Sequence, residues 1–133
     1  MRRIQTLANL TATTMALSAC AVIPDAPNVE GIPSPQGSTV ALGQPVRLGD
    51  LVVTPRQIVE DSRCAKDVEC IWAGRLIVQT RIDGAGWHDT ANIMLGETYG
   101  THGRVIALTS ATPGKALGKD IPPEAYRFRY ELR

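Results

Sequence analysis

Residues 126–133 read YRFRYELR, and their pattern is the strongest indication of secondary structure in the chain. Tyrosine, phenylalanine and leucine occupy every second position, while arginine and glutamate occupy the positions between them. Successive side chains of a β-strand point to opposite faces, so this alternation predicts a strand with one buried and one solvated face. Half-buried strands of this kind are typical of antiparallel sheets.

The same period of two recurs upstream. In residues 75–82, Leu76, Val78, Thr80 and Ile82 alternate with the side chains between them. The sequence Asp-Gly-Ala-Gly at 83–86 then predicts a turn into a second strand at 87–95. Shorter strands are expected at 39–48, 51–60 and 104–109. Proline lacks a backbone N–H, so Pro45 and Pro55 indicate that the first two of these are bent, bulged or at a sheet edge.

About six short strands separated by Gly- and Pro-rich turns predict a small antiparallel β-sandwich, with an open barrel as the alternative. No helical periodicity follows residue 37, although residues 122–125 are expected to start a single helical turn. The Gly-rich stretch at 96–103 is expected to form a mobile loop. A length of 133 residues leaves room for one such domain, which we assign to residues 38–133.

The N-terminus has the order of residues found in a secretory signal. Arg2 and Arg3 precede a mainly apolar stretch at 4–17, which is shorter than the roughly 20 residues of a membrane-spanning helix. The last four residues of the segment, Leu-Ser-Ala-Cys at 17–20, resemble the bacterial lipobox. The resemblance implies that residues 1–19 are a signal peptide and that Cys20 is lipidated.

A lipidated Cys20 predicts a protein anchored in the bacterial cell envelope. Several acyl chains together make such attachment lasting. Ala21 follows the cysteine, where an aspartate often signals retention in the inner membrane, so we expect the outer membrane, facing the periplasm. The alternative is an ordinary signal peptide, cut near Ala19 or Ala21, that leaves a free protein.

Residues 20–37 are predicted to form a semi-extended tether. The segment contains four prolines, which disfavour both helix and central strand, at positions 24, 27, 33 and 35. Such a tether would hold the β domain away from the bilayer.

Composition and charge argue against a nucleic-acid partner. The formal charge of the whole chain is +1, and removing Arg2 and Arg3 with the signal peptide changes it to −1. A chain that is nearly neutral has no general electrostatic attraction to nucleic acid or to an anionic membrane surface. The expected membrane contact is therefore the lipid anchor alone.

The three cysteines divide into one isolated residue and one close pair. If Cys20 carries lipid, Cys64 and Cys70 remain to form one disulfide, and no thiol is left over. Disulfides persist outside the reducing cytosol, so this pairing agrees with export. Zinc ligation by these cysteines would need two further ligands, and only His88 and His102 are available, so we expect a disulfide and no metal.

Residues 60–74, EDSRCAKDVECIWAG, contain the most distinctive motif. It resembles that of a group of small, uncharacterised exported bacterial proteins, many of them lipoproteins, with Glu-Asp-Ser-Arg-Cys and then Cys, an aliphatic residue and Trp-Ala-Gly. The usual proline after the first cysteine is replaced by Ala65. The group also tends to have a Pro-Pro-Glu turn before a terminal strand, as at residues 122–133. The resemblance covers residues 39–133 and implies no activity.

From the residues alone, the motif is expected to be a disulfide-closed loop between two strands. Trp72 is expected to pack on the disulfide or the domain interior, and Asp61 and Arg63 to form local turn hydrogen bonds or an ion pair. A constrained loop also binds at lower ordering cost, so it is a candidate recognition loop. Its candidate residues are Asp61, Arg63, Lys66, Asp67, Glu69 and Trp72. Cation binding by Asp61, Asp67 and Glu69 is a weaker alternative, since their spacing is not that of a calcium loop.

These observations predict a non-catalytic envelope lipoprotein that acts as a binding or structural module, without a cofactor. The expected partner is an envelope protein or peptide. The alternative is a small periplasmic hydrolase that uses His88 or His102, although no complete catalytic motif is present. His88 is expected on the solvent face of its strand, and His102 in an exposed turn.

Overall fold

The structure is a computed structural model that describes residues 30–133. The expected signal peptide, Cys20 and the first part of the tether lie outside the described residues. The lipid anchor and the outer-membrane location therefore stay predictions. Among residues 30–133, no helix has the length and apolar character needed to cross a bilayer.

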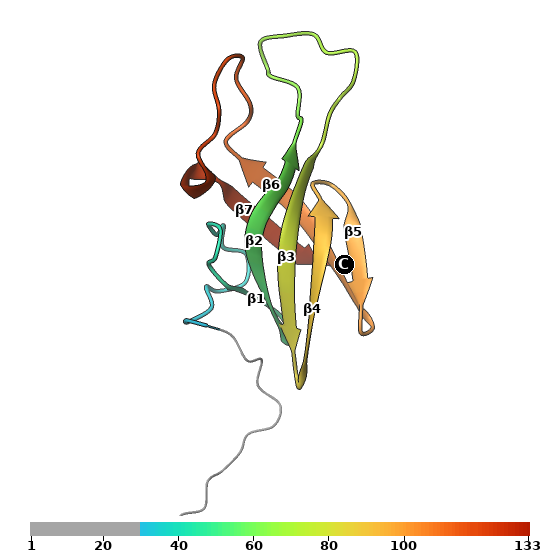
Figure 1. Ribbon diagram of the computed structural model, residues 1–133. Coiled ribbons are helices and arrows are strands. Elements are labelled where there is room, and N and C mark those ends of the chain that lie inside the picture. Colours follow the sequence, from blue (N-terminus) through green and yellow to red (C-terminus); the bar gives the residue numbers. More distant parts are fainter. Residues whose placement is uncertain (1–29) are drawn as a thin grey trace, which may run out of the picture.

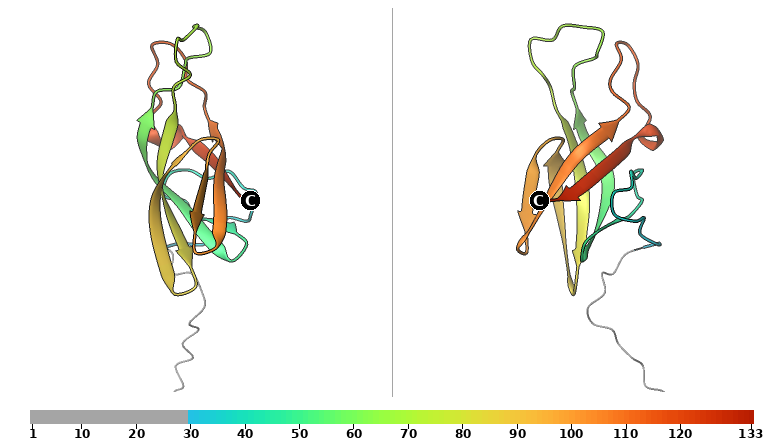
Figure 2. Two further views of the ribbon diagram at one scale, coloured as in Figure 1. Left: turned by 90° about the vertical axis from the view of Figure 1, so that its right-hand side faces the viewer. Right: turned by 180° about the vertical axis from the view of Figure 1, so that it is seen from behind.

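Within residues 30–133, seven strands form two antiparallel sheets, which confirms the predicted all-β sandwich (Figures 1 and 2). The four-stranded sheet has the order β1 (Val46–Leu48), β2 (Leu51–Asp61), β3 (Leu76–Gly84) and β4 (Trp87–Met94). The three-stranded sheet has the order β5 (Thr98–Thr101), β6 (Arg104–Thr112) and β7 (Arg127–Leu132). A single 3₁₀ turn, η1 (Pro123–Ala125), precedes β7 at the expected position.

The two strands with the clearest alternation form as predicted. In β7, Phe128 and Tyr130 are buried while Arg127 and Arg129 are exposed. In β3, every second side chain from Leu76 to Ile82 is buried. Inward side chains from both sheets make up the core, whose largest members are Tyr130, Phe128, Leu48, Leu51, Leu76 and Ile82.

Two strand predictions need correction. The expected strand at 39–48 is reduced to β1, because a turn in which the Gln44 N–H donates to the Ala41 carbonyl (3.1 Å) interrupts it just before Pro45. The stretch at 96–103, expected to be a mobile loop, contains β5 and the turn into β6. Tyr99 packs against the core in β5, and this burial outweighs the flexibility of the neighbouring glycines.

Proline acts on β2 as the sequence predicts. The register between β2 and β3 shifts between Pro55 and Gln57, which is a β-bulge or a similar irregularity. A second shift lies between Ile58 and Glu60. At the β1 edge of the same sheet, Ser34 forms a parallel bridge with Val46. A residue in the range expected for the tether therefore pairs with the β domain.

A buried polar contact joins the two sheets. The hydroxyls of Thr80 in β3 and Tyr130 in β7 lie 2.9 Å apart, and both residues are buried. Burial of a polar group is costly unless the group is hydrogen-bonded, so this pair favours one alignment of the two layers. Desolvation raises the pKa of the Tyr130 hydroxyl above its ordinary value, so the hydroxyl is protonated at neutral pH.

Two long connections extend from the same end of the sandwich (Figures 1 and 2). One is the β2–β3 connection at 62–75, and the other is the first part of the β6–β7 connection at 113–122. We call these two segments the tip loops and their common end the tip. Residues 30–45, where the described chain begins, lie away from the tip loops (Figure 1).

Candidate functional site

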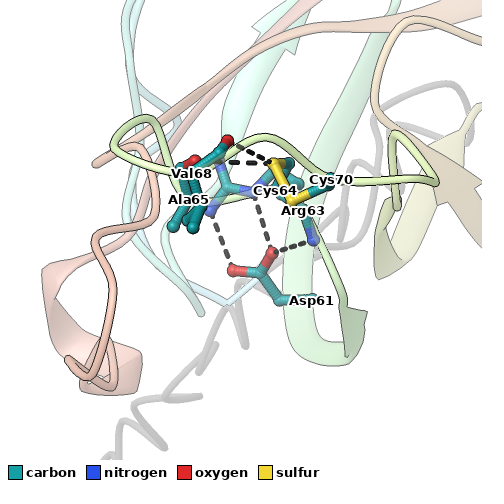
Figure 3. Close-up of a disulfide and its surroundings, with 6 residues drawn as sticks. All are labelled: Asp61, Arg63, Cys64, Ala65, Val68 and Cys70. Atoms are coloured by element: carbon teal, nitrogen blue, oxygen red, sulfur yellow. Dashed lines mark hydrogen bonds and ion pairs between the residues drawn. A yellow bond between two sulfur atoms is a disulfide. The ribbon is translucent and has the colours of Figure 1, made fainter.

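Asp61, at the end of β2, is the centre of the contacts that hold the tip loops. The Arg63 guanidinium donates to both of its carboxylate oxygens, from Nε to Oδ1 at 2.8 Å and from Nη2 to Oδ2 at 2.8 Å (Figure 3). The Tyr126 hydroxyl, from just before β7, donates to Oδ2 at 2.7 Å. The Asp61 and Arg63 side chains are only 8% and 15% exposed, so little water competes for these bonds. We call these three residues the Asp61 cluster.

The ionisation of the cluster follows from these contacts. Partial burial raises the pKa of Asp61, but hydrogen bonds from Arg63 and Tyr126 outweigh this effect and lower the pKa to about 2. Burial and the hydrogen bond to Asp61 raise the pKa of Tyr126 to about 12. At neutral pH the cluster therefore contains a carboxylate, a guanidinium and a neutral phenol, as its hydrogen bonds require.

Three further hydrogen bonds hold the second tip loop against the first tip loop and the end of β2. The Arg63 Nη2 also donates to the Pro113 carbonyl at 3.1 Å, and the Lys115 Nζ donates to the Asp61 carbonyl at 2.8 Å. Between the loop backbones, the Lys66 N–H donates to the Lys115 carbonyl at 3.2 Å. Segments about 50 residues apart in sequence are therefore held as one unit.

The base of the first tip loop is closed by a second set of contacts. The Ser62 N–H donates to the Arg75 carbonyl at 2.8 Å, and the Arg75 N–H donates to the Ser62 Oγ at 3.1 Å. The Arg75 guanidinium pairs with Glu60 at 2.7 Å, in an exposed position. Gly74 has a φ of +67°, and a Cβ added to it would lie 1.8 Å from the Ser62 carbonyl oxygen. Only glycine fits at this position.

Replacing Gly74 with alanine is expected to lower the free energy of unfolding by about 2 kcal/mol, since the new Cβ forces the Ser62–Arg75 backbone apart. The matched control is Gly86→Ala, because Gly86 also has a positive φ of 74° but no atom within 4 Å of its added Cβ. The control should lose about 1 kcal/mol, the cost of the backbone conformation alone. Urea denaturation of the two variants measures the difference, and equal losses would contradict the clash.

The predicted disulfide is present within the first tip loop. Cys64 and Cys70 are bonded, with their Cα atoms 5.9 Å apart (Figure 3). Within the ring the Val68 N–H donates to the Ala65 carbonyl at 3.2 Å, and outside it the Cys64 N–H donates to the Ala73 carbonyl at 3.3 Å. The disulfide and these bonds restrict the conformations available to the loop.

The expectation that Trp72 packs on the disulfide or in the interior is wrong. The Trp72 side chain is 82% exposed, and the neighbouring Ile71 is 93% exposed. Two other large apolar side chains of the tip are also exposed, Val68 at 40% and Leu117 at 67%. The Asp61 cluster and the Ser62–Arg75 backbone pair close the loop base without tryptophan, so the burial expected for its hydrophobicity does not occur.

The predicted recognition residues separate into two groups. Asp61 and Arg63 form the expected ion pair, and their mutual bonding makes them part of the loop framework. Lys66, Asp67 and Glu69 are exposed on the loop with Trp72. Within residues 30–133, no three His, Cys, Asp or Glu side chains gather in a way that could hold a metal ion.

Sequence reasoning missed the contribution of residues outside the motif. Tyr126 and Leu117 come from the β6–β7 connection, and Ile71 was given no role of its own. The sequence gives no indication that Tyr126 reaches Asp61, 65 residues away. The apolar residue between Cys70 and Trp72 was a usable signal, since an Ile-Trp pair in a polar loop is either buried or available for binding.

The histidines lie outside the tip. His88 is exposed on β4, as expected from its strand position. His102 occupies the β5–β6 turn with a φ of 46°, and its ring stacks on Trp87 with centroids 3.8 Å apart. Its Nδ1 lies 2.9 Å from the Thr101 Oγ1, which in turn donates to Asp89 at 2.9 Å.

This arrangement connects the β4 and β5 edges of the two sheets. The Tyr99 hydroxyl also donates to Asp89, at 2.8 Å, so two hydroxyls of β5 bind one carboxylate of β4. The turn that contains His102 lies at the start of β6, whereas the second tip loop begins where β6 ends and is hydrogen-bonded to the first tip loop, which contains Ser62. His102 and Ser62 are therefore at opposite ends of the sandwich and cannot form a nucleophile–base pair.

The fold and these contacts define a small β-sandwich protein whose distinctive site is a braced, disulfide-closed loop beside a second loop. No family model, no curated protein and no solved structure matches the chain.

Proposed function

We propose that this protein is a non-catalytic binding module of the cell envelope, anchored through lipid on Cys20, whose tip recognises a protein surface. The observation that carries the proposal is the exposure of Ile71 and Trp72, 93% and 82%, on a loop that is closed by a disulfide and braced by the Asp61 cluster. A contiguous apolar patch on the surface of a protein commonly marks an interaction site.

The chemistry of the tip fits a protein partner. Interfaces between proteins have an apolar centre surrounded by polar residues, and tryptophan is enriched among the side chains that contribute most to affinity. In the first tip loop, Lys66, Asp67 and Glu69 precede Ile71 and Trp72 in sequence, and all five residues are exposed. The braced loop loses little conformational entropy on binding, so more of the contact energy contributes to affinity.

The position of the tip relative to the N-terminal segment also supports the proposal. Residues 30–45, which follow the proposed anchor, lie away from the tip loops (Figure 1). A chain held to the membrane through its N-terminal segment would thus present the tip to the space beyond the bilayer. The motif resemblance to exported bacterial lipoproteins agrees with this arrangement.

Capture from envelope extracts tests the recognition role. The immobilised chain should retain an envelope protein that is lost when Ile71 and Trp72 are both replaced by serine. Retention of every bound protein by the folded double variant would refute the tip as the binding surface.

The anchor has its own test. Replacing Cys20 with serine should move the protein from the membrane fraction to the soluble fraction, because the acyl chains that hold it are then absent. Intact-mass analysis of the native chain should show the acyl groups. A Cys20→Ser variant that remains fully in the membrane fraction would contradict lipid anchoring.

A further inference from the structure

The segment that carries Ile71 and Trp72 is held in place mainly by the disulfide. Within the described part of the chain, residues 69–72 form no backbone hydrogen bond with any other residue. Both apolar side chains are exposed, so packing adds little restraint. Cys70 lies in this segment, and its bond to Cys64 fixes the segment to the start of the loop. The position of Ile71 and Trp72 therefore depends on this covalent bond.

The base of the loop does not depend on the disulfide. Ser62 and Arg75 are joined through their backbones, and the Asp61 cluster connects the end of β2 to Tyr126. The cysteines take no part in these contacts. Opening the disulfide would release residues 69–72 locally, while the loop base and the sandwich keep their structure.

The disulfide is open to attack, and its reduced form has hydrogen-bond acceptors nearby. Cys70 is exposed and Cys64 is half-buried, so an incoming thiolate reaches Cys70 more readily. Exposed disulfides are among the labile and regulatory ones. The Cys64 Sγ lies 3.3 Å from the Val68 carbonyl oxygen and 3.4 Å from the Ala65 carbonyl oxygen (Figure 3). After reduction, either oxygen can accept the S–H of Cys64.

We propose that the Cys64–Cys70 disulfide is a redox switch for the tip, with a protein dithiol of the cell envelope as its reductant. The inference rests on the proposed binding role and adds its regulation. In an oxidising compartment the loop is closed, and Ile71 and Trp72 are held ready for a partner. In the reduced chain the same segment must be ordered when it binds, which lowers the affinity.

The exchange takes place in two steps. One thiolate of the dithiol attacks the Cys70 Sγ and forms a mixed disulfide, and the Cys64 sulfur leaves as a thiolate and takes up a proton. The second thiol of the dithiol then loses its proton and attacks its neighbour in the mixed disulfide, and the Cys70 sulfur leaves and is protonated. Two electrons and two protons pass to the chain, and the dithiol becomes a disulfide.

Fluorine NMR of the full chain in detergent micelles, labelled with 5-fluorotryptophan, tests the local release. After reduction with dithiothreitol and alkylation of Cys64 and Cys70, the Trp72 resonance should narrow and move towards its position in the urea-unfolded chain. The Trp87 resonance should stay in place, because the sandwich remains folded. A disulfide that resists reduction without urea, an unchanged Trp72 resonance, or a change at Trp87 as large as that at Trp72 would each overturn the switch.

Capture from envelope extracts tests the control of binding. The reduced and alkylated chain, freed of dithiothreitol, should bind its partner about tenfold more weakly than the disulfide form. The Cys64→Ser/Cys70→Ser double variant carries no alkyl groups and should show the same weakening. Equal capture by the open and closed forms would overturn the switch and leave the recognition role in place. Failure of both forms to capture any protein would contradict the recognition role and the switch together.

Discussion

Replacing Asp61 with alanine is expected to lower the free energy of unfolding at neutral pH by about 3 kcal/mol. The substitution leaves the Arg63 guanidinium, only 15% exposed, and the Tyr126 hydroxyl without their shared acceptor. Breaking a buried pair by removing one partner is costly because the remaining charge stays poorly solvated. Urea denaturation, followed by far-UV circular dichroism, measures the loss.

The adjacent residue provides a matched control for this variant. Glu60 also pairs with an arginine, but the Arg75 and Glu60 side chains are 54% and 34% exposed. Water replaces such a contact readily, so Glu60→Ala should change stability far less than Asp61→Ala. Similar losses from the two variants would show that the Asp61 cluster has no special role.

The same cluster predicts how stability depends on pH. The pKa of Asp61 falls from 3.8 to about 2 in the folded chain, so its contribution is present above pH 3.8 and is lost as the pH falls towards 2. The pKa of Tyr126 rises from 10 to about 12, so its contribution is present below pH 10 and is lost as the pH rises towards 12. Asp61→Asn should reduce the acid dependence in this window without abolishing it, because hydrogen bonds also lower the pKa values of Asp50, Glu60 and Asp89. A wild-type profile that is flat between pH 4 and 2 would be inconsistent with the lowered pKa of Asp61.

Replacing both Ile71 and Trp72 with serine is expected to weaken partner binding by more than about 100-fold. Side chains at the centre of an interface commonly contribute about 2 kcal/mol or more each, and a factor of ten in affinity corresponds to about 1.4 kcal/mol. The free energy of unfolding should stay nearly unchanged, because both side chains are already exposed in the folded chain. Quantitative capture at a series of chain concentrations gives the change in affinity.

Exposed apolar residues elsewhere on the sandwich provide the control for this experiment. Val59 and Val105 are 46% and 39% exposed, and they lie on β2 and β6. Their replacement by serine should leave binding unaffected if the tip alone makes the contact. Equal weakening by the two double variants would point to general hydrophobic adsorption.

The strands were predictable where apolar and polar residues alternate along the sequence. The alternation in residues 126–133 and 75–82 specified which side chains enter the core, and Pro55 marked an irregular register in β2. β5 was missed because the glycines at 96, 100 and 103 resemble those of a loop. Only contact with the core and with Asp89 shows why Tyr99 and Thr101 are held in a strand.

The site was predictable only in its local parts. Cysteine spacing and the proximity of Asp61 to Arg63 gave the disulfide and the ion pair. The role of Tyr126 depends on how β7 crosses the end of β2, and that of Leu117 on the pairing of two loops. Trp72 was placed incorrectly because hydrophobicity favours burial on average, whereas this loop is closed by polar contacts.

The chain contains two tryptophans, so fluorine NMR of the chain labelled with 5-fluorotryptophan tests the recognition role directly. Trp87 stacks on His102 and serves as the internal reference, while Trp72 is 82% exposed at the tip. We predict that the Trp72 resonance of the isolated chain responds strongly to exchange of H₂O for D₂O. On addition of envelope extract, this resonance alone should shift or broaden. A Trp72 resonance that is insensitive to solvent, or that stays unchanged while Trp87 responds to the extract, would contradict the account.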